Sequence, residues 1–265
     1  MKRIHIIILL LLSASSIIAF KSYEPTRTVP NKSFGVGEKV EYRVHYGFIN
    51  AAEAKVEIGK NVTVVNNKPC FRINVHGRTV GPFDLISRVR DTWRSYVDTN
   101  TILPHKFERS IQENKYRKEE TVDFNHSKDI AISTVKNESK TYHVPNNIHD
   151  IVSGYFFLRT VNFDKVAEGE VIEVPTFFDG EVYKLRVRYV GKDVIKTKFG
   201  KTKVLRLNPL IPDNKLFKGE GALKLWISDD ANKIPLKVEV ELWIGSLDMD
   251  LKSYKGLKSD IVWQK

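Results

Sequence analysis

The side chains most suggestive of chemistry lie in one short loop. Asp229, Asp230 and Asn232 follow one another within four positions, between two runs of strand-forming residues. Carboxylate and amide oxygens in such close succession can bind a cation or activate a water molecule. They also turn a chain readily, because Asp and Asn side chains hydrogen-bond to nearby backbone N–H groups. The rest of the sequence distinguishes between these two roles.

A second copy of this loop favours the turn. The run 98–108 (DTNTILPHKFE) aligns with the run 229–239 (DDANKIPLKVE). Both start with Asp and continue through an aliphatic residue to a proline, which is tolerated at the first residue of a strand. The first copy has a single loop carboxylate, and the second lacks the ligand spacing of a calcium loop. We therefore predict two structural turns and no metal site, with the turn residues Asp98, Pro104, Asp229, Asp230, Asn232 and Pro235.

The other reactive residues form no recognisable catalytic pattern. Cys70 is the only cysteine, and its alternating flanks predict a buried structural thiol without a disulfide. The histidines after residue 20 lack the i,i+2 and i,i+4 spacings that direct two imidazoles at one ion. No Gly-x-Ser-x-Gly motif or Gly-rich phosphate loop occurs. The sequence predicts no catalytic residue, metal or cofactor, and an enzyme is the less favoured interpretation.

The first twenty residues predict export. Lys2 and Arg3 precede an apolar run over 6–12, and small residues follow up to Ala19. This order is typical of a secretory signal peptide cleaved after Ala19, and a retained anchor over 4–20 is the alternative. The formal charge of +11 would indicate nucleic acid in a cytosolic protein, but export argues against that partner. We expect a periplasmic or extracellular protein with no transmembrane segment after cleavage.

From residue 34 onward, polar and apolar residues alternate with a period of two. The runs 39–46, 183–190 and 235–242 show this pattern, which is typical of strands with one wet face. Strands at this spacing, without long helices between them, predict a mainly β, antiparallel fold. The segment 147–159 is the exception. Its apolar residues recur at helical spacing after Asp150 or Asn147, either of which can serve as N-cap.

Short matches between the two parts of the chain indicate an internal repeat. Gly37-Glu38 and the strand after it resemble Gly180-Glu181 and the strand after that, in addition to the two Asp loops. We expect a signal peptide at 1–19, a linker at 20–33, a first β half at 34–145, a helical connection at 146–164 and a second β half at 165–265. The two similar halves would pack on the central helix as one compact unit.

Four stretches resemble a known family. They are 34–47, which begins Phe34-Gly35-Val36-Gly37-Glu38, then 89–104, 150–153 and 226–230. Over about 34–257 the chain resembles an exported bacterial family known as domain of unknown function 3108 (DUF3108). Its strand–Asp-loop–Pro–strand unit is also similar to hairpins of periplasmic lipoprotein carriers. That similarity implies a curved antiparallel sheet, half-barrel or barrel-like, around an apolar cavity.

Aromatic residues make up 11% of the chain, and several precede the two Asp loops. They either fill the core of the curved sheet or line a pocket for an acyl chain or a sugar. The candidate ligand-binding residues are Arg90, Asp91, Trp93, Tyr96 and Trp226. The favoured function is a non-catalytic periplasmic binding or carrier module for an apolar or amphipathic envelope molecule. Its partner would be a lipid, a polysaccharide or an envelope protein. A structural or interaction protein of the envelope and a carbohydrate-active enzyme are the alternatives.

Overall fold

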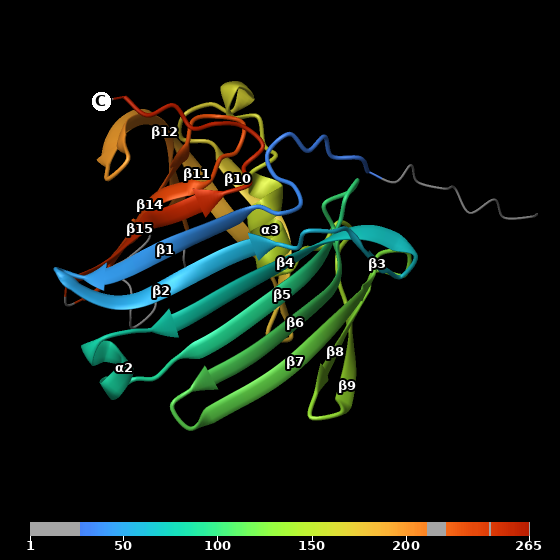
Figure 1. Ribbon diagram of the computed structural model, residues 1–265. Coiled ribbons are helices and arrows are strands. Elements are labelled where there is room, and N and C mark those ends of the chain that lie inside the picture. The colour runs from blue at the N-terminus through green and yellow to red at the C-terminus, as the bar shows by residue number, and fades with distance from the viewer. Residues whose placement is uncertain (1–26, 211–220, 244, 265) are drawn as a thin grey trace, which may run out of the picture.

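A computed structural model describes residues 27–210, 221–243 and 245–264 (Figure 1). The predicted signal peptide, 1–19, lies outside the described residues. The first half of the chain forms β1 (Lys39–Tyr46), β2 (Ile49–Ile58), β3 (Thr63–Val65), β4 (Lys68–Thr79), β5 (Arg90–Asp98), β6 (Pro104–Glu113), β7 (Tyr116–Asn125), β8 (Ile130–Val135) and β9 (Glu138–His143). The second half forms β10 (Val171–Phe178), β11 (Glu181–Thr197), β12 (Gly200–Pro209), β13 (Leu223–Ser228), β14 (Pro235–Glu241) and β15 (Ser246–Lys255). The helices are α2 (Pro82–Ile86), α3 (Ile151–Leu158) and the short 3-10 helix η1 (Phe163–Lys165).

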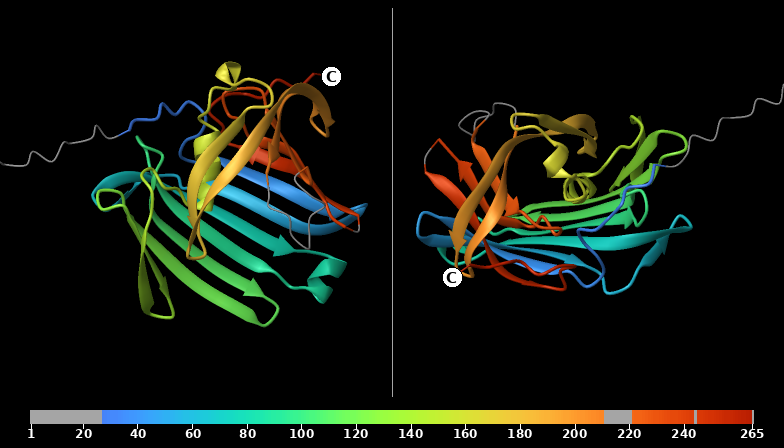
Figure 2. Two further views of the ribbon diagram at one scale, coloured as in Figure 1. Left: turned by 180° about the vertical axis from the view of Figure 1, so that it is seen from behind. Right: turned by 90° about the horizontal axis from the view of Figure 1, so that it is seen from above.

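The described strands belong to one sheet. Its order is β10-β11-β12-β13-β14-β15-β1-β2-β4-β5-β6-β7-β8-β9, and β3 pairs with β4. The two parts of the chain meet where β15 pairs with β1. Figure 2 shows the sheet curling around α3, which gives it an inner face toward this helix and an outer face away from it. The predicted mainly β fold, with a curved antiparallel sheet and one central helix, is confirmed.

Helix α3 forms where the sequence predicts it, with Asp150 as N-cap. The Asp150 carboxylate accepts hydrogen bonds from the backbone N–H groups of Val152 (2.8 Å) and Ser153 (2.7 Å). Ser95 of β5 donates to the other carboxylate oxygen at 2.6 Å, which ties the start of the helix to the sheet. Burial raises the pKa of Asp150 to about 6, against the opposing effect of these hydrogen bonds.

One end of the inner face is packed against α3. Val152 and Phe156 of the helix share a core with apolar side chains of seven strands, including Ile73, Phe107 and Val122. Leu158, at the end of the helix, belongs to a second core with strands of the second half. Burial of these side chains is the main favourable contribution to folding. We call this part of the molecule the helix end.

A buried ion pair joins distant segments at the helix end. Arg159 follows α3 and donates to both carboxylate oxygens of Glu38, at 2.6 and 3.0 Å. Its remaining N–H groups donate to the backbone carbonyls of Ser33 and Asn232. Arg159 and Glu38 are almost completely buried, so both charges depend on this arrangement. A single guanidinium thus connects the N-terminal arm, the helix and the loop between β13 and β14.

The two Asp loops also lie at the helix end and form turns. Asp98 accepts hydrogen bonds from the N–H groups of Asn100 and Thr101, at 2.7 and 2.9 Å. In the loop between β13 and β14, Asp230 does the same with Asn232 and Lys233, at 2.8 and 3.1 Å. These bonds replace backbone partners that the turn lacks, as in an Asx-turn.

The second loop differs from the sequence alignment in one respect. We aligned Asp98 with Asp229, but the Asp229 carboxylate lies 3.4 Å from Lys192 Nζ, and Asp230 closes the turn. The backbone explains the shift. Asp98 N donates to Leu103 O, whereas Ser228 N donates to Ile234 O, so the second loop is one residue longer. Asn232 is buried and holds the C-terminal arm through two hydrogen bonds with the backbone of Ser259.

Helix α2 is a departure from the predicted elements, since the sequence did not indicate it. The helix has five residues, too few for a periodic pattern to show. Pro82 lies in its first turn, where proline costs no hydrogen bond. Among the described residues, no helix combines the length and the apolarity needed to cross a bilayer.

Candidate functional site

Beside the core under α3, the inner face carries a continuous row of apolar side chains. The pairs Leu225–Val238, Val238–Met249, Met249–Val44 and Val44–Ala52 stand opposite one another in adjacent strands. Directly paired residues point to the same side of a sheet. Leu225 packs against the core that contains Leu158 of α3, so this side is the inner one. We call these five residues the inner apolar row.

The inner apolar row is only partly covered. All five of its members are partly exposed, in contrast to the buried side chains beneath α3. Next to it, Ala54 pairs with Gly77, and Gly77 pairs with Asp91. A Cβ placed on Gly77 would have no atom of another described residue within 4 Å, so among these residues the sheet borders open space there. We call this part of the molecule the open end.

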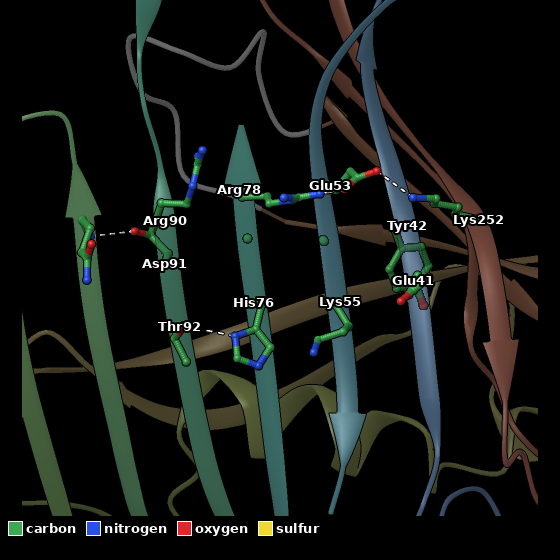
Figure 3. Close-up of a pocket in the computed structure, with 13 residues that line it drawn as sticks. Glu41, Tyr42, Glu53, Lys55, His76, Arg78, Arg90, Asp91, Thr92 and Lys252 are labelled. Atoms are coloured by element: carbon green, nitrogen blue, oxygen red, sulfur yellow. Dashed lines mark hydrogen bonds and ion pairs between the residues drawn. The ribbon is translucent and has the colours of Figure 1, made fainter. Parts of the chain in front are cut away.

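The outer face of the same strands is charged and polar. Glu53 pairs with Arg78, which donates to it at 2.6 Å, and with Lys252 at 2.7 Å. His76 lies 3.1 Å from the Thr92 hydroxyl. These residues line a cleft of about 540 Å³ (Figure 3), which runs across strands β15 to β6. Its charged groups largely pair with one another across strands, as expected of a solvated sheet face.

The structure does not bring the five candidate ligand-binding residues together. Neighbouring residues of a strand point to opposite faces. Trp93 packs against the core beneath α3, and therefore Arg90 and Tyr96 lie on the outer face while Asp91 lies on the inner one. Trp226 follows Leu225 in β13 and therefore lies on the outer face, where Lys237 Nζ is 5.3 Å from its ring centroid. Arg90 pairs with Asp84, and Asp91 accepts a hydrogen bond from Gln112 N.

Of these candidates, Trp93 has the most informative surroundings. Its ring lies 5.6 Å from that of Phe178, and its cross-strand partner Val75 belongs to the same inner face. The indole Nε1 is buried and has no hydrogen-bond acceptor among the described residues. Buried donors are normally satisfied in native proteins. The indole N–H is thus a donor on the inner face that the described part of the chain leaves without an acceptor.

Sequence reasoning missed the inner apolar row, although its signal was present. Val44, Val238 and Met249 each occupy the apolar positions of an alternating run. Alternation predicts which side of a strand is apolar, but the exposure of that side depends on what packs over it.

Several buried ionisable groups have structural partners. Glu120 binds Arg109 and accepts from Ser133, and Asp150 caps α3. Although burial opposes it, hydrogen bonds from His105 and backbone N–H groups lower the pKa of Asp98 to about 2. Burial raises the pKa of the Cys70 thiol to about 12, so Cys70 is a buried, weakly nucleophilic thiol. In the part of the chain that is described, no group of three or more His, Cys, Asp or Glu residues could hold a metal ion.

Comparisons with known proteins agree with this fold. A search of curated proteins found no match. Among solved structures, the chain is similar to the crystal structure of a β-barrel-like protein of domain of unknown function DUF1849 from Brucella abortus. The TM-score is 0.50 at 8% sequence identity, over 83% of this chain and 97% of that chain, and at this identity the similarity shows the fold alone. The family model described as protein of unknown function (DUF3108) matches residues 41–252, which confirms the resemblance seen in the motifs. The chain therefore belongs to the DUF3108 family.

Proposed function

We propose that this protein is a non-catalytic binding or carrier protein for an apolar or amphipathic molecule of the cell envelope, in the exported compartment that its N-terminus predicts. The observation that carries the proposal is the inner apolar row. Partly exposed aliphatic side chains stand in register across five neighbouring strands of an inner face. An acyl chain lying across the row would remove this apolar surface from water, at roughly 25 cal/mol per Å².

Two further features of the inner face favour an amphipathic ligand. Small residues, Ala52, Ala54 and Gly77, leave room beside the larger members of the row. The indole N–H of Trp93, on the same face beside the core under α3, is a buried donor without an acceptor among the described residues, and an amphipathic ligand that extends from the row toward α3 would bring an oxygen to it. Binding sites of this kind combine an apolar lining with a few polar groups that fix orientation. The outer cleft is lined mostly by charged and polar residues and carries no part of this proposal.

The test is native mass spectrometry of the mature protein purified from its own cell envelope, beside a denatured control. We expect a bound species of discrete mass that organic solvent releases. Val238→Lys should reduce its occupancy roughly tenfold or more, because it places a charge in the inner apolar row. The matched control is Val194→Lys, at a valine of β11 that is already 53% exposed, and it should leave occupancy unchanged.

A bare wild-type mass under gentle conditions would overturn the proposal, provided that circular dichroism shows folded protein. Equal occupancy in Val238→Lys and wild type would also contradict it, because the ligand would then bind elsewhere.

A further inference from the structure

The open end carries large apolar side chains that the core does not bury. The exposed fractions are 97% for Phe48, 91% for Leu85, 77% for Ile86 and 65% for Trp243. These four residues, which we call the apolar rim, come from the turn between β1 and β2, from α2 and from the turn between β14 and β15. The three connections lie at the same end of the sheet (Figure 1). Apolar residues gathered in this way mark an interaction surface.

The apolar residues of helix α2 are not explained by burial in the core. Its sequence, PFDLI, has four apolar residues out of five, but none of them is buried. The segment is nevertheless held on both sides. Val80 N donates to Ala51 O at 2.9 Å, and Asn114 N donates to Arg88 O at 2.8 Å. A firmly positioned helix that turns Leu85 toward water is suited to contact a partner.

The three connections form one continuous surface around Tyr46. The ring of Tyr46 lies 6.2 Å from that of Phe83 in α2. On its other side, Gly245 of the β14–β15 turn is so close that an added Cβ would lie 2.5 Å from the Tyr46 hydroxyl. Tyr46 itself ends β1, directly before the turn that presents Phe48. The three connections that carry the apolar rim therefore meet at Tyr46.

On the side of α2, the surroundings of the apolar rim are basic. The segments 84–90 and 113–117 are joined by hydrogen bonds between Arg88 and Asn114. They contain four cationic side chains and two acidic ones, a net charge of +2. One of the acids, Asp84, is already paired with Arg90 at 2.7 Å. The cationic residues are Arg88, Arg90, Lys115 and Arg117.

We propose that the apolar rim docks this protein on the surface of an anionic lipid bilayer. Tryptophan and large aliphatic side chains partition into the boundary between headgroups and acyl chains, and neighbouring Lys and Arg residues contact lipid phosphates. Val44 of the inner apolar row lies two residues before the end of β1, so docking places this row next to the lipid. The docking proposal does not depend on the carrier function, and the test distinguishes the two.

The experiment is co-sedimentation of the full mature chain with vesicles of phosphatidylethanolamine and phosphatidylglycerol, beside vesicles of phosphatidylcholine alone. The test variant is Phe48→Ser/Leu85→Ser. The matched control is Val64→Ser/Val262→Ser, which removes two apolar residues of 71% and 74% exposure outside the rim. We expect binding of wild type and control to the anionic vesicles. The test variant should bind roughly tenfold or more weakly, because two large apolar side chains no longer enter the interface.

Several results decide the question. Weaker binding of the wild type to phosphatidylcholine, or at high salt, supports the basic contribution. Equal vesicle binding of test variant and control would overturn the proposal. A second set of results would also overturn it: the wild type forms a dimer in light scattering, the test variant does not, and neither binds vesicles. The rim would then bind a second copy of the chain. Native mass spectrometry of the test variant keeps the docking surface distinct from the carrier function, since its ligand occupancy should be unchanged.

Discussion

Apolar side chains are buried at the helix end of the sheet and partly exposed at its open end. At the helix end, Phe156 and Ile73 are completely buried, whereas Val238 and Met249 at the open end stay partly exposed. Both ends belong to the same strands and show the same alternation. The difference is the cover, because α3 has eight residues and a length of about 12 Å, whereas a strand of twelve residues such as β4 extends over about 40 Å. A short helix can close only one end of such a sheet.

The largest expected effect tests this difference directly. Phe156→Ala should lower the free energy of unfolding by about 3–5 kcal/mol, because it opens a cavity in a closed core. Met249→Ala removes a side chain that water already reaches, and about 1 kcal/mol or less should be lost. Urea unfolding followed by circular dichroism measures both. Equal losses would mean that the open end is as closely packed as the helix end.

A smaller effect concerns how the helix end responds to acid. Burial, with the nearby charge of Arg27, lowers the pKa of His149 to about 3. In the unfolded chain the His149 imidazole binds a proton near pH 6.5, whereas in the folded protein it stays neutral down to about pH 3. His149 therefore makes the free energy of unfolding fall as the pH falls from about 6.5 toward 3. Asp150 acts in the opposite direction between about pH 4 and 6, because its pKa is raised to about 6 in the folded state.

Removing the imidazole should therefore make the helix end less sensitive to acid. Between pH 6.5 and 4.5, His149→Gln should lose about 2–3 kcal/mol less unfolding free energy than the wild type. Urea unfolding at both pH values measures the change. His149→Phe, which also lacks the contact with Ser153, should show the same reduced slope even if it is less stable at pH 7. A wild-type slope in both variants would show that His149 is protonated in the folded protein.

The smallest effect separates two neighbouring carboxylates of the helix end. Asp230→Ala should cost about 1 kcal/mol, because two turn N–H groups lose their acceptor. Asp229→Ala should stay within about 0.5 kcal/mol of the wild type, since its carboxylate forms an ion pair with Lys192, whose side chain is half exposed. Chemical unfolding of both variants gives the comparison. A larger loss in Asp229→Ala would restore the alignment of Asp229 with Asp98.

Local signals predicted most of the fold. The alternating runs became β1, β11 and β14, and the segment after Asp150 became α3 with the expected cap. These features depend on nearest neighbours and on a period along the chain. Helix α2 escaped prediction because five residues with no buried face leave no periodic pattern. Asp230 replaced Asp229 in the turn because loop length depends on how the strands pair, which the alignment of two short runs does not contain.

The candidate site was predictable only in part. Arg90, Asp91 and Trp93 are adjacent in sequence, but the pleat sends Asp91 and Trp93 to one face and Arg90 to the other. Trp226 and Trp93 both precede an Asp loop, but Trp93 lies on the inner face and Trp226 packs beside Lys237 on the outer face. Proximity along a strand therefore did not imply a common site. The residues that do share a surface include Val44 of β1 together with Val238 and Met249 of β14 and β15, which lie at the other end of the chain.

The sequence by itself determined the strand pattern, the capped helix, the two aspartate turns and the apolar side of each strand. These follow from backbone preferences and from alternation, which act over a few residues. The tertiary structure alone decided which strands are neighbours, where the buried Arg159–Glu38 pair joins the chain, and how far α3 reaches across the inner face. Exposure is a property of packing between distant segments. For that reason only the folded chain separates a closed core at one end from an apolar row and rim at the other.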